Sequence, residues 1–134
     1  MSKKNIIITG GAGFIGSHLT AYLANKGAEV VVLDNLLRGN KIEADILEKI
    51  TLIQGDVRDQ NLVIKLAENC DYIYHLAAIL GVDIVADNPV ETMETEVEGT
   101  KNVLRKMDKA GIKNLIFTSS VAVYGLNKNN PDEE

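Results

Sequence analysis

The sequence has little of several features on which small proteins often depend. Cys70 is the only cysteine among 134 residues, which excludes an internal disulfide and a cysteine-rich metal site. With two prolines and 46% hydrophobic residues, the composition excludes collagen and intrinsic disorder. No apolar run approaches the roughly 18 residues that span a bilayer, so we expect no membrane partner. The cysteine usage favours a reducing, cytoplasmic location.

Positive charge is also scarce. Lys and Arg number 14 against 19 Asp and Glu, which gives a net charge of -5. Proteins that bind nucleic acids gather cations against the phosphate backbone, so we expect no nucleic-acid partner. A chain of this length forms one compact core, and we treat residues 1–134 as a single domain.

Short apolar runs recur along the chain, and they do not alternate with polar residues. This pattern is typical of strands that are buried on both faces of a parallel sheet. The expected strands cover residues 6–8, 30–33, 52–53, 72–74 and 115–117.

Segments with helical spacing separate these strands. We predict a helix over residues 14–23, a second over 62–67 capped by Asp59, and a long one over 89–110. Gly27 and Gly111 are the expected stops of the first and the long helix. The apolar faces should bury Phe14, Ile15, His18, Leu19, Tyr22 and Leu23 in the first, and Val90, Met93, Val97, Thr100, Leu104 and Met107 in the long one.

The remaining segments read as loops. Residues 35–49 should form a loop with a short helix over 42–48, and residues 127–131 a polar loop. The alternation of strand and helix predicts an α/β fold, a doubly wound parallel sheet with helices on both faces and about five strands. Ligands of such sheets bind at the carboxyl ends of the strands. Here these ends lie near Thr9, Asp34, His75 and Thr118.

A glycine-rich turn follows the first expected strand. Gly10 permits a sharp turn, Gly13 lets the backbone approach a pyrophosphate, and Gly16 permits close packing of the helix on the strand. The helix that starts near Gly13 would direct its free N–H groups toward the phosphates. Glycines in a strand-to-helix turn can also be only a turn, but the apolar strand before them and the amphipathic helix after them favour phosphate binding.

Two carboxylates follow the next strands. Asp34 lies about 18 residues after Gly16, close to the roughly 20-residue offset of an acid that binds the ribose of a dinucleotide. A carboxylate there repels a 2′-phosphate and favours NAD, although Arg38 nearby keeps NADP open, and a turn-capping Asp is the alternative. Asp56 either contacts adenine or caps a turn.

Six segments together resemble a known family, the extended short-chain dehydrogenases/reductases with their Rossmann fold. The resemblance is strongest to nucleotide-sugar epimerases and dehydratases of the UDP-glucose 4-epimerase branch. The segments are Thr9-Gly10-Gly11-Ala12-Gly13-Phe14-Ile15-Gly16-Ser17-His18-Leu19, Asp34-Asn35-Leu36, Gly55-Asp56-Val57, His75-Leu76-Ala77-Ala78, Gly99-Thr100-Lys101-Asn102-Val103-Leu104 and Ser119-Ser120-Val121-Ala122-Val123-Tyr124-Gly125.

The resemblance implies a set of site residues and a chemistry. Ser120 would bind the reacting oxygen of a nucleotide sugar, while a hydride moves to the nicotinamide and leaves a transient keto sugar. The tyrosine and lysine of a Tyr-x-x-x-Lys helix would move the hydroxyl proton. The implied NAD-binding residues are Gly10, Gly13, Phe14, Ile15, Gly16, Asp34, Asn35, Asp56, Val57, Ala77, Ala78 and Thr118.

This chain departs from the family at several positions. Glu96 stands where the family usually has an asparagine with an amide contact near the cofactor. Val121 and Ala122 stand where 4,6-dehydratases have an acid-base pair, which disfavours dehydration. Tyr124 and Lys128 spell Tyr-x-x-x-Lys, but the glycine, asparagines and proline around them are poor helix formers, so we do not assign them as catalytic.

We therefore expect the NAD-binding portion of a nucleotide-sugar epimerase, with the Tyr-x-x-x-Lys helix and the substrate domain beyond residue 134 and no activity of this chain alone. The alternatives are a short module that binds or senses NAD, and a sugar-nucleotide reductase or decarboxylase of the same family. The resemblance also implies a homodimer through the helix over residues 89–110. We expect no metal site, because neither His18 nor His75 has carboxylate or cysteine partners at metal-ligand spacing.

Overall fold

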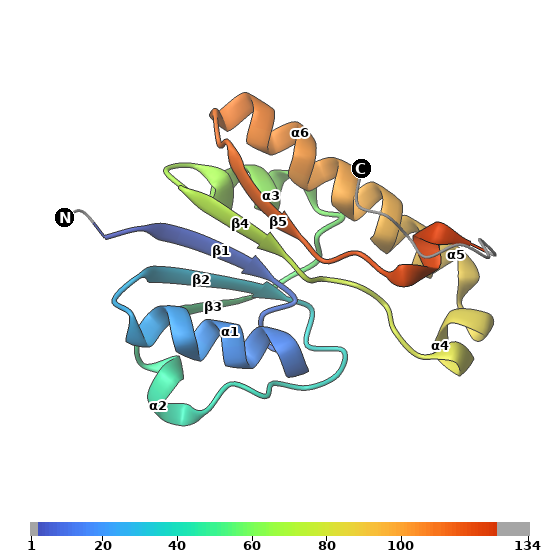
Figure 1. Cartoon of the computed structure of the whole chain (residues 1–134), viewed down its shortest axis with the longest axis horizontal. Helices are drawn as coiled ribbons and strands as arrows, with labels where there is room; N and C mark the ends of the chain where they lie inside the picture. Colours follow the sequence, from blue (N-terminus) through green and yellow to red (C-terminus); the bar gives the residue numbers. More distant parts are fainter. Residues whose placement is uncertain (1–2, 126–134) are drawn as a thin grey trace.

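The computed structural model describes residues 3–125 as one sheet of five parallel strands with helices on both sides (Figure 1). The order in the sheet is β3-β2-β1-β4-β5, so β1 lies at the centre. The doubly wound parallel sheet expected from the sequence is confirmed. The strands are β1 (Asn5–Thr9), β2 (Glu29–Asp34), β3 (Thr51–Gln54), β4 (Tyr72–His75) and β5 (Asn114–Phe117).

The helices connect the parallel strands in the order of the chain. A π-helical turn, Glu94–Gly99, joins the last two α-helices into one continuous helical segment from 89 to 110, as predicted. A 3-10 turn, Val121–Tyr124, follows β5. The α-helices are α1 (Phe14–Asn25), α2 (Ala44–Leu47), α3 (Gln60–Ala67), α4 (Val82–Asp87), α5 (Pro89–Met93) and α6 (Thr100–Ala110).

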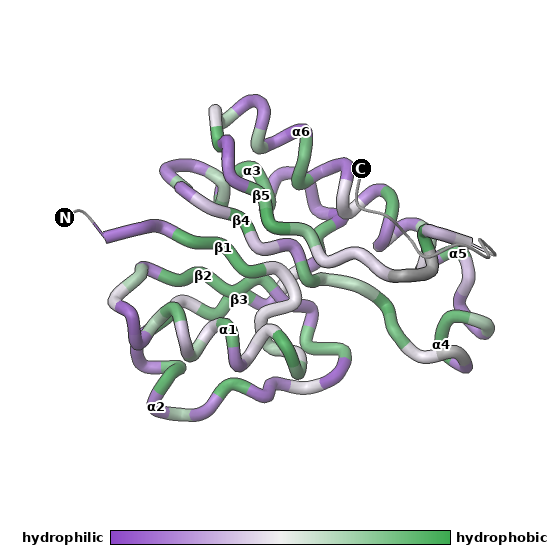
Figure 2. Tube along the Cα trace, in the orientation of Figure 1, coloured by the Kyte–Doolittle hydropathy of each residue, from purple (hydrophilic) through white to green (hydrophobic). Residues whose placement is uncertain are grey.

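Alternate residues of β1 face two separate hydrophobic cores. Ile7 packs with buried residues of α3 and α6, whereas Ile6 and Ile8 pack on the opposite face with residues of the α1 and α2 side. Figure 2 shows that β1 and β2 are hydrophobic over most of their length. The burial of both faces explains why the apolar runs do not alternate with polar residues.

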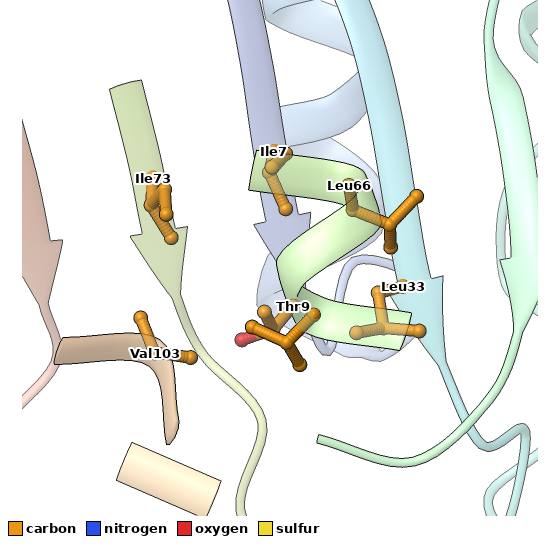
Figure 3. Close-up of a pocket in the computed structure, with 7 residues that line it drawn as sticks. Ile7, Thr9, Leu33, Leu66, Ile73 and Val103 are labelled. Atoms are coloured by element: carbon orange, nitrogen blue, oxygen red, sulfur yellow. The ribbon is translucent and has the colours of Figure 1, made fainter. Parts of the chain in front are cut away.

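A small void lies between the sheet and helices α3 and α6 (Figure 3). Its volume is about 10 Å³, and its lining is apolar apart from Thr9. A cavity of this size is at the lower limit for one water molecule, and the walls offer too few polar partners to hold it. The void is therefore a packing defect, and it is not a ligand site. Its lining is Ile7, Thr9, Leu33, Val63, Leu66, Ile73 and Val103.

The buried face predicted for the first helix is wrong except at Leu19 and Leu23, which are half-buried against the core. Phe14 and Ile15 are 72% and 66% exposed, and Tyr22 is exposed as well. The helix instead buries Gly16 and Thr20, together with Ser17. Small residues face inward because α1 begins directly on the glycine-rich turn, where the backbones approach too closely for large side chains.

The buried face predicted for the long helix is also wrong, except at Met107. The other apolar positions on that face are exposed or only half-buried, and smaller or polar side chains take the inner face. Gly99 illustrates the reason, since a Cβ there would lie 2.6 Å from a methyl group of Val57. The exposed apolar residues are Val90, Met93, Val97 and Leu104, and the buried residues are Thr92, Thr95, Gly99, Asn102, Val103, Lys106 and Met107.

Several of the smaller predictions from the sequence are confirmed. Asp59 caps α3 by accepting hydrogen bonds from the N–H groups of Asn61 and Leu62, and Gly111 ends α6 in the left-handed conformation. The short helix predicted within 42–48 is α2, but α4 was not predicted. No helix among residues 3–125 has the length and apolarity to cross a membrane. The loop predicted over 127–131 lies outside the described residues.

Candidate functional site

The candidate site lies at the carboxyl ends of the strands, where the chain order reverses on either side of β1. The chain passes from β1 to β2 and β3 on one side, and returns to β4 and β5 on the other. The loops that follow β1, β2 and β4 therefore meet at one edge of the sheet, beside the N-terminus of α1 (Figure 1). Ligands of open α/β sheets bind at this switch point.

The turn after β1 requires glycine at its first position. Gly10 has φ of +70°, and a Cβ there would lie 2.7 Å from the backbone nitrogen of Ala77. Its N–H donates to the Leu33 carbonyl at 2.8 Å. At Gly13, by contrast, a Cβ would meet only the Gly10 carbonyl oxygen, at 3.3 Å, so the space beside Gly13 is open. This open side is the cradle that a phosphate group would fill.

The close packing expected of Gly16 is present, but its partner differs from the expectation. A Cβ on Gly16 would collide with the backbone of Gly10 and Gly11, so this glycine packs on the turn. Gly11, which the sequence argument left out, is the glycine that packs on the sheet, because its Cβ would lie 2.8 Å from a methyl group of Val32.

The N-terminus of α1 faces the same open space. Gly13 is the N-cap, with no side-chain cap and no acidic residue in the first turn. The first N–H groups of a helix have no partner within the helix, and the helix dipole makes this end positive. Phe14 and Ile15 belong to that first turn and point their side chains outward, so they would meet an anion through their backbone.

Asp34 is bonded directly to the glycine-rich turn. Its Oδ2 accepts the Ala12 N–H at 2.9 Å, and its Oδ1 accepts the Leu36 N–H at 2.8 Å. A carboxylate has about four lone-pair sites, so each oxygen can still accept a hydroxyl. Asn35 is exposed and closes the loop by accepting the Leu37 N–H at 3.0 Å. The structure thus places two carboxylate oxygens with remaining acceptor sites beside the glycine-rich turn.

Asp56 is occupied by Arg58. The carboxylate accepts the Arg58 N–H at 2.8 Å, and it accepts the guanidinium from Nε at 3.0 Å and from Nη2 at 2.6 Å. This pairing holds the pKa of Asp56 below its usual range. The guanidinium also meets Glu91 and Glu94, each at 3.3 Å. The geometry matches the turn-capping alternative, and the contact with adenine stays a prediction.

Val57 lies next to this pair with its side chain buried under Gly99. Its carbonyl accepts the side-chain amide of Asn102 at 3.2 Å, and the Arg58 carbonyl accepts it at 3.0 Å. Only the backbone of Val57 is therefore placed to meet a ligand. The sequence argument missed Asn102, although an asparagine predicted within a helix next to apolar residues is a signal for a buried polar contact.

A buried histidine connects the loop after β4 to the end of β1. Thr9 Oγ1 lies 2.7 Å from His75 Nδ1, and His75 Nε2 lies 3.1 Å from Thr100 Oγ1. The Ala77 N–H donates to Thr9 Oγ1 at 3.3 Å, so this hydroxyl bonds both the histidine ring and the loop after β4. Burial lowers the pKa of His75 to about 4, so the ring is neutral at pH 7. Ala78, the next residue of the loop, is exposed.

The end of β5 is the most open part of the site. Thr118 is exposed and its hydroxyl donates to the His75 carbonyl at 3.4 Å. Ser120 is exposed as well, and its carbonyl accepts the Val123 N–H at 3.1 Å at the start of the 3-10 turn. Tyr124 ends that 3-10 turn, so it does not lie on an α-helix, whereas Lys128 lies outside the described residues.

The structure therefore joins most of the predicted residues through direct contacts. The glycine-rich turn is bonded to Asp34, it touches the backbone of Ala77, and Thr118 reaches the same loop through His75. Asp56 and Val57 stand apart, because Val57 contacts the helical segment 89–110 directly and Asp56 is linked to that segment through Arg58. Among residues 3–125, no group of histidine, cysteine and acidic side chains could hold a metal ion.

Comparison with known proteins finds matches over most of the chain. The family described as NAD dependent epimerase/dehydratase matches residues 6–134. The chain is 41% identical over 124 residues to UDP-N-acetyl-alpha-D-glucosaminuronate decarboxylase of Bacillus cytotoxicus, covering 92% of this chain and 38% of that protein. It is 39% identical over 122 residues to UDP-glucose 4-epimerase of Halalkalibacterium halodurans, covering 90% and 36%. The chain thus spans less than half the length of these relatives.

Solved structures resemble it over almost its whole length. UDP-N-acetylglucosamine 4-epimerase from Methanobrevibacter ruminantium, in complex with UDP-N-acetylmuramic acid, has a TM-score of 0.87 at 34% identity, over 100% of this chain and 43% of that one. UDP-glucose 4-epimerase from Brucella ovis, in complex with NAD, has a TM-score of 0.80 at 32% identity, over 96% and 39%.

Proposed function

The chain belongs to the NAD dependent epimerase/dehydratase family, and on that premise we propose that it is the NAD-binding part of a nucleotide-sugar epimerase. The observation that carries the proposal is the hydrogen bond from the Ala12 N–H to Asp34. It joins an acceptor pair for a ribose diol to an open cradle for a pyrophosphate, which is the arrangement that an adenine dinucleotide requires. Bound NAD would supply the hydride acceptor.

Different groups of the described residues would bind different parts of the cofactor. The backbone at Gly10, Gly13 and the first turn of α1 would hold the pyrophosphate, with Gly16 allowing the close approach. Asp34 and Asn35 would hold the adenosine ribose. Asp56 and Val57 would lie toward the adenine, and Ala77, Ala78 and Thr118 toward the nicotinamide.

The sugar chemistry rests on fewer groups of this chain. Ser120 would hydrogen-bond the reacting oxygen of a nucleotide-sugar substrate. A proton must also leave that oxygen, and the Tyr-x-x-x-Lys pair that α1 does carry, Tyr22 and its C-cap residue Lys26, lies at the end of the helix away from the candidate site. We therefore propose that residues 1–134 bind the dinucleotide and do not turn over the sugar.

A decarboxylase is the second candidate, because one relative with 41% identity is named as a UDP-N-acetyl-alpha-D-glucosaminuronate decarboxylase. Oxidation of a sugar hydroxyl to a ketone can begin both reactions, and the site described above serves either. A reductase, or a short module that binds or senses NAD without catalysis, uses the same residues. We favour the epimerase because several solved structures that resemble the chain are named as epimerases.

Calorimetric titration with NAD and NADP tests the proposal on the 134-residue chain. We expect NAD to bind about tenfold tighter or more than NADP, because the Asp34 carboxylate repels a 2′-phosphate and accepts a ribose diol. Asp34→Ser should weaken NAD binding and reduce this preference. Asp45→Ser removes an exposed carboxylate on α2 and is the matched control, with unchanged affinities expected.

Two results would contradict the proposal. The absence of NAD binding at millimolar concentration would remove the dinucleotide site. Epimerase turnover by the 134-residue chain would contradict the proposed inactivity and would return attention to Tyr124 and Lys128.

We also propose homodimerisation through the helical segment 89–110. The exposed apolar residues Val90, Met93, Val97 and Leu104 support this, because a partner helix would bury them. A single monomeric species in sedimentation at high concentration would contradict it.

We also place the protein in the cytoplasm, where its one cysteine would stay reduced.

A further inference from the structure

Two side chains outside the predicted site bind the same short segment of the loop between β4 and α4. Arg38 comes from the loop after β2, and Glu96 comes from the π-helical turn before α6. Both reach residues 79–81, which follow the loop residues Ala77 and Ala78. The segment is therefore held from two sides of the molecule.

The contact with Arg38 crosses the candidate crevice. The Arg38 guanidinium donates from Nη2 to the Leu80 carbonyl, and a Cβ on Gly81 would lie 3.0 Å from the same Nη2. Arg38 follows β2 and Leu80 follows β4, and β1 lies between these two strands in the sheet. The hydrogen bond thus joins two loops that leave the carboxyl edge of the sheet on opposite sides of β1. Figure 1 shows both loops at this end of the sheet.

Glu96 holds the other end of the segment. Its Oε1 accepts the Ile79 N–H at 2.8 Å. The side chain of Ile79 is buried, whereas that of Leu80 is 70% exposed. Ile79 therefore anchors the segment to the protein interior, and Leu80 faces solvent. Gly81 ends it at φ of +112°, a conformation that side chains rarely adopt. π-helical turns occur often at functional sites, and this one carries the carboxylate that fixes the loop.

We propose that residues 79–81 form a strap across the dinucleotide crevice, and that Arg38 and Glu96 are the positioning residues that hold it closed. The inference rests on the proposed function, since the strap acts on the bound dinucleotide. A dinucleotide under the strap leaves only when the Arg38 contact breaks. The contact breaks equally for entry, so the strap slows association and dissociation together.

Stopped-flow fluorescence of NADH, chased with excess NAD, measures this dissociation directly. Arg38→Gln should release NADH about tenfold faster, the rate change for a hydrogen bond of about 1.4 kcal/mol. Association should also accelerate, so that the equilibrium affinity changes less than either rate. Arg105→Gln removes an exposed arginine of α6 and is the matched control, for which both rates should equal those of the unmodified chain.

The affinity for AMP distinguishes a role of Arg38 in the strap from a role as a direct ligand of the dinucleotide. AMP lacks the nicotinamide half and does not extend under the strap, so its affinity should be the same for Arg38→Gln and the unmodified chain. An equal loss of AMP and NADH affinity would overturn the proposal, because it would make Arg38 a direct ligand of the adenylate half.

Glu96 gives an independent test with its own conservative variant. Glu96→Gln keeps a carbonyl oxygen that can accept the Ile79 N–H, so NADH dissociation should stay within about twofold. Glu96→Leu removes the acceptor and should accelerate dissociation about tenfold. Equal rates for both variants and the unmodified chain would overturn the role of Glu96.

The outcomes also separate the strap from the proposed function. NADH that binds, but leaves Arg38→Gln at the unmodified rate, overturns the strap alone. A chain that binds neither NADH nor AMP overturns the dinucleotide site and the strap with it.

Discussion

Strands β1 and β5 carry similar short apolar runs, but they have very different surroundings. Ile8 of β1 is 0% exposed, and its neighbours Ile6 and Ile7 are buried. In β5, Ile116 and Phe117 are 39% and 52% exposed. The difference follows from position, because β1 is the centre of the sheet with helices on both faces and β5 is the last strand on its side. Hydrophobicity indicates a strand, but it does not indicate how deep in the sheet the strand lies.

The candidate site shows the same contrast. Beside β1, the glycine-rich turn and Asp34 are fixed by backbone contacts with each other. Beside β5, Thr118 and Ser120 are exposed. The side that we propose binds phosphate and adenosine is thus preorganised within the described residues, whereas the side proposed for the sugar is exposed.

The largest expected effect tests this contrast in the strands themselves. Ile8→Ala should lower the free energy of unfolding by about 3 kcal/mol, because it leaves a cavity in a closely packed core. Ile116→Ala makes the same chemical change at the exposed position and should cost about 1 kcal/mol or less. Urea unfolding midpoints at a constant m-value measure both. Equal losses would show that β5 is as deeply packed in solution as β1.

Two glycines with the same backbone angle isolate the tightness of the turn after β1. Gly10 and Gly111 both have φ of +70°, but a Cβ at Gly111 meets nothing within 4 Å. Gly111→Ala should therefore cost about 1 kcal/mol of unfolding free energy for the backbone angle alone. Gly10→Ala should cost about 2 kcal/mol more, because its Cβ meets the backbone of Ala77. If the two variants unfold at the same midpoint, the turn is looser than described.

The buried histidine makes the β1–β4 side sensitive to acid. The pKa of His75 is about 4 in the fold, below the ordinary value of 6.5, so the unfolded chain binds the proton more readily. Its contribution to stability is complete above pH 6.5 and decreases as the pH falls toward 4. We expect a loss of about 2 kcal/mol between pH 7 and pH 5 that His75→Gln does not show.

His18 provides the control for this experiment, because it is exposed on α1. His18→Gln should keep the pH dependence of the unmodified chain. Parallel curves of unfolding free energy against pH for His75→Gln and the unmodified chain would contradict the prediction.

The smallest expected effect concerns the exposed face of the long helix. Leu104 is exposed, so Leu104→Gln should change the unfolding free energy by less than about 0.5 kcal/mol. The same variant should weaken self-association in sedimentation, because it removes apolar surface that a partner would bury. A large loss of stability at concentrations where the chain is monomeric would show that this face packs within the chain.

Much of this architecture could be predicted from local patterns. The apolar runs located all five strands, the alternation of elements gave the parallel sheet, and Asp59 and Gly111 marked a helix start and a helix end. Most of the buried faces of α1 and of the segment 89–110 could not be predicted, because Gly16 and Gly99 face inward for close backbone approach and not for hydrophobicity. The roles of Arg38, Glu96 and His75 were hidden as well, since each contacts residues far away in the chain.

The sequence by itself determined the order of strands and helices, the position of the glycine-rich turn and the acidic residue after β2. These features depend on local periodicity and on a spacing of about 18 residues, so they are readable along the chain. Only the tertiary structure decided that Arg58 meets Glu91 and Glu94, that His75 links Thr9 to Thr100, and that Arg38 and Glu96 meet one loop. Such contacts join residues far apart in the chain, which come together only when the sheet and its covering helices have formed.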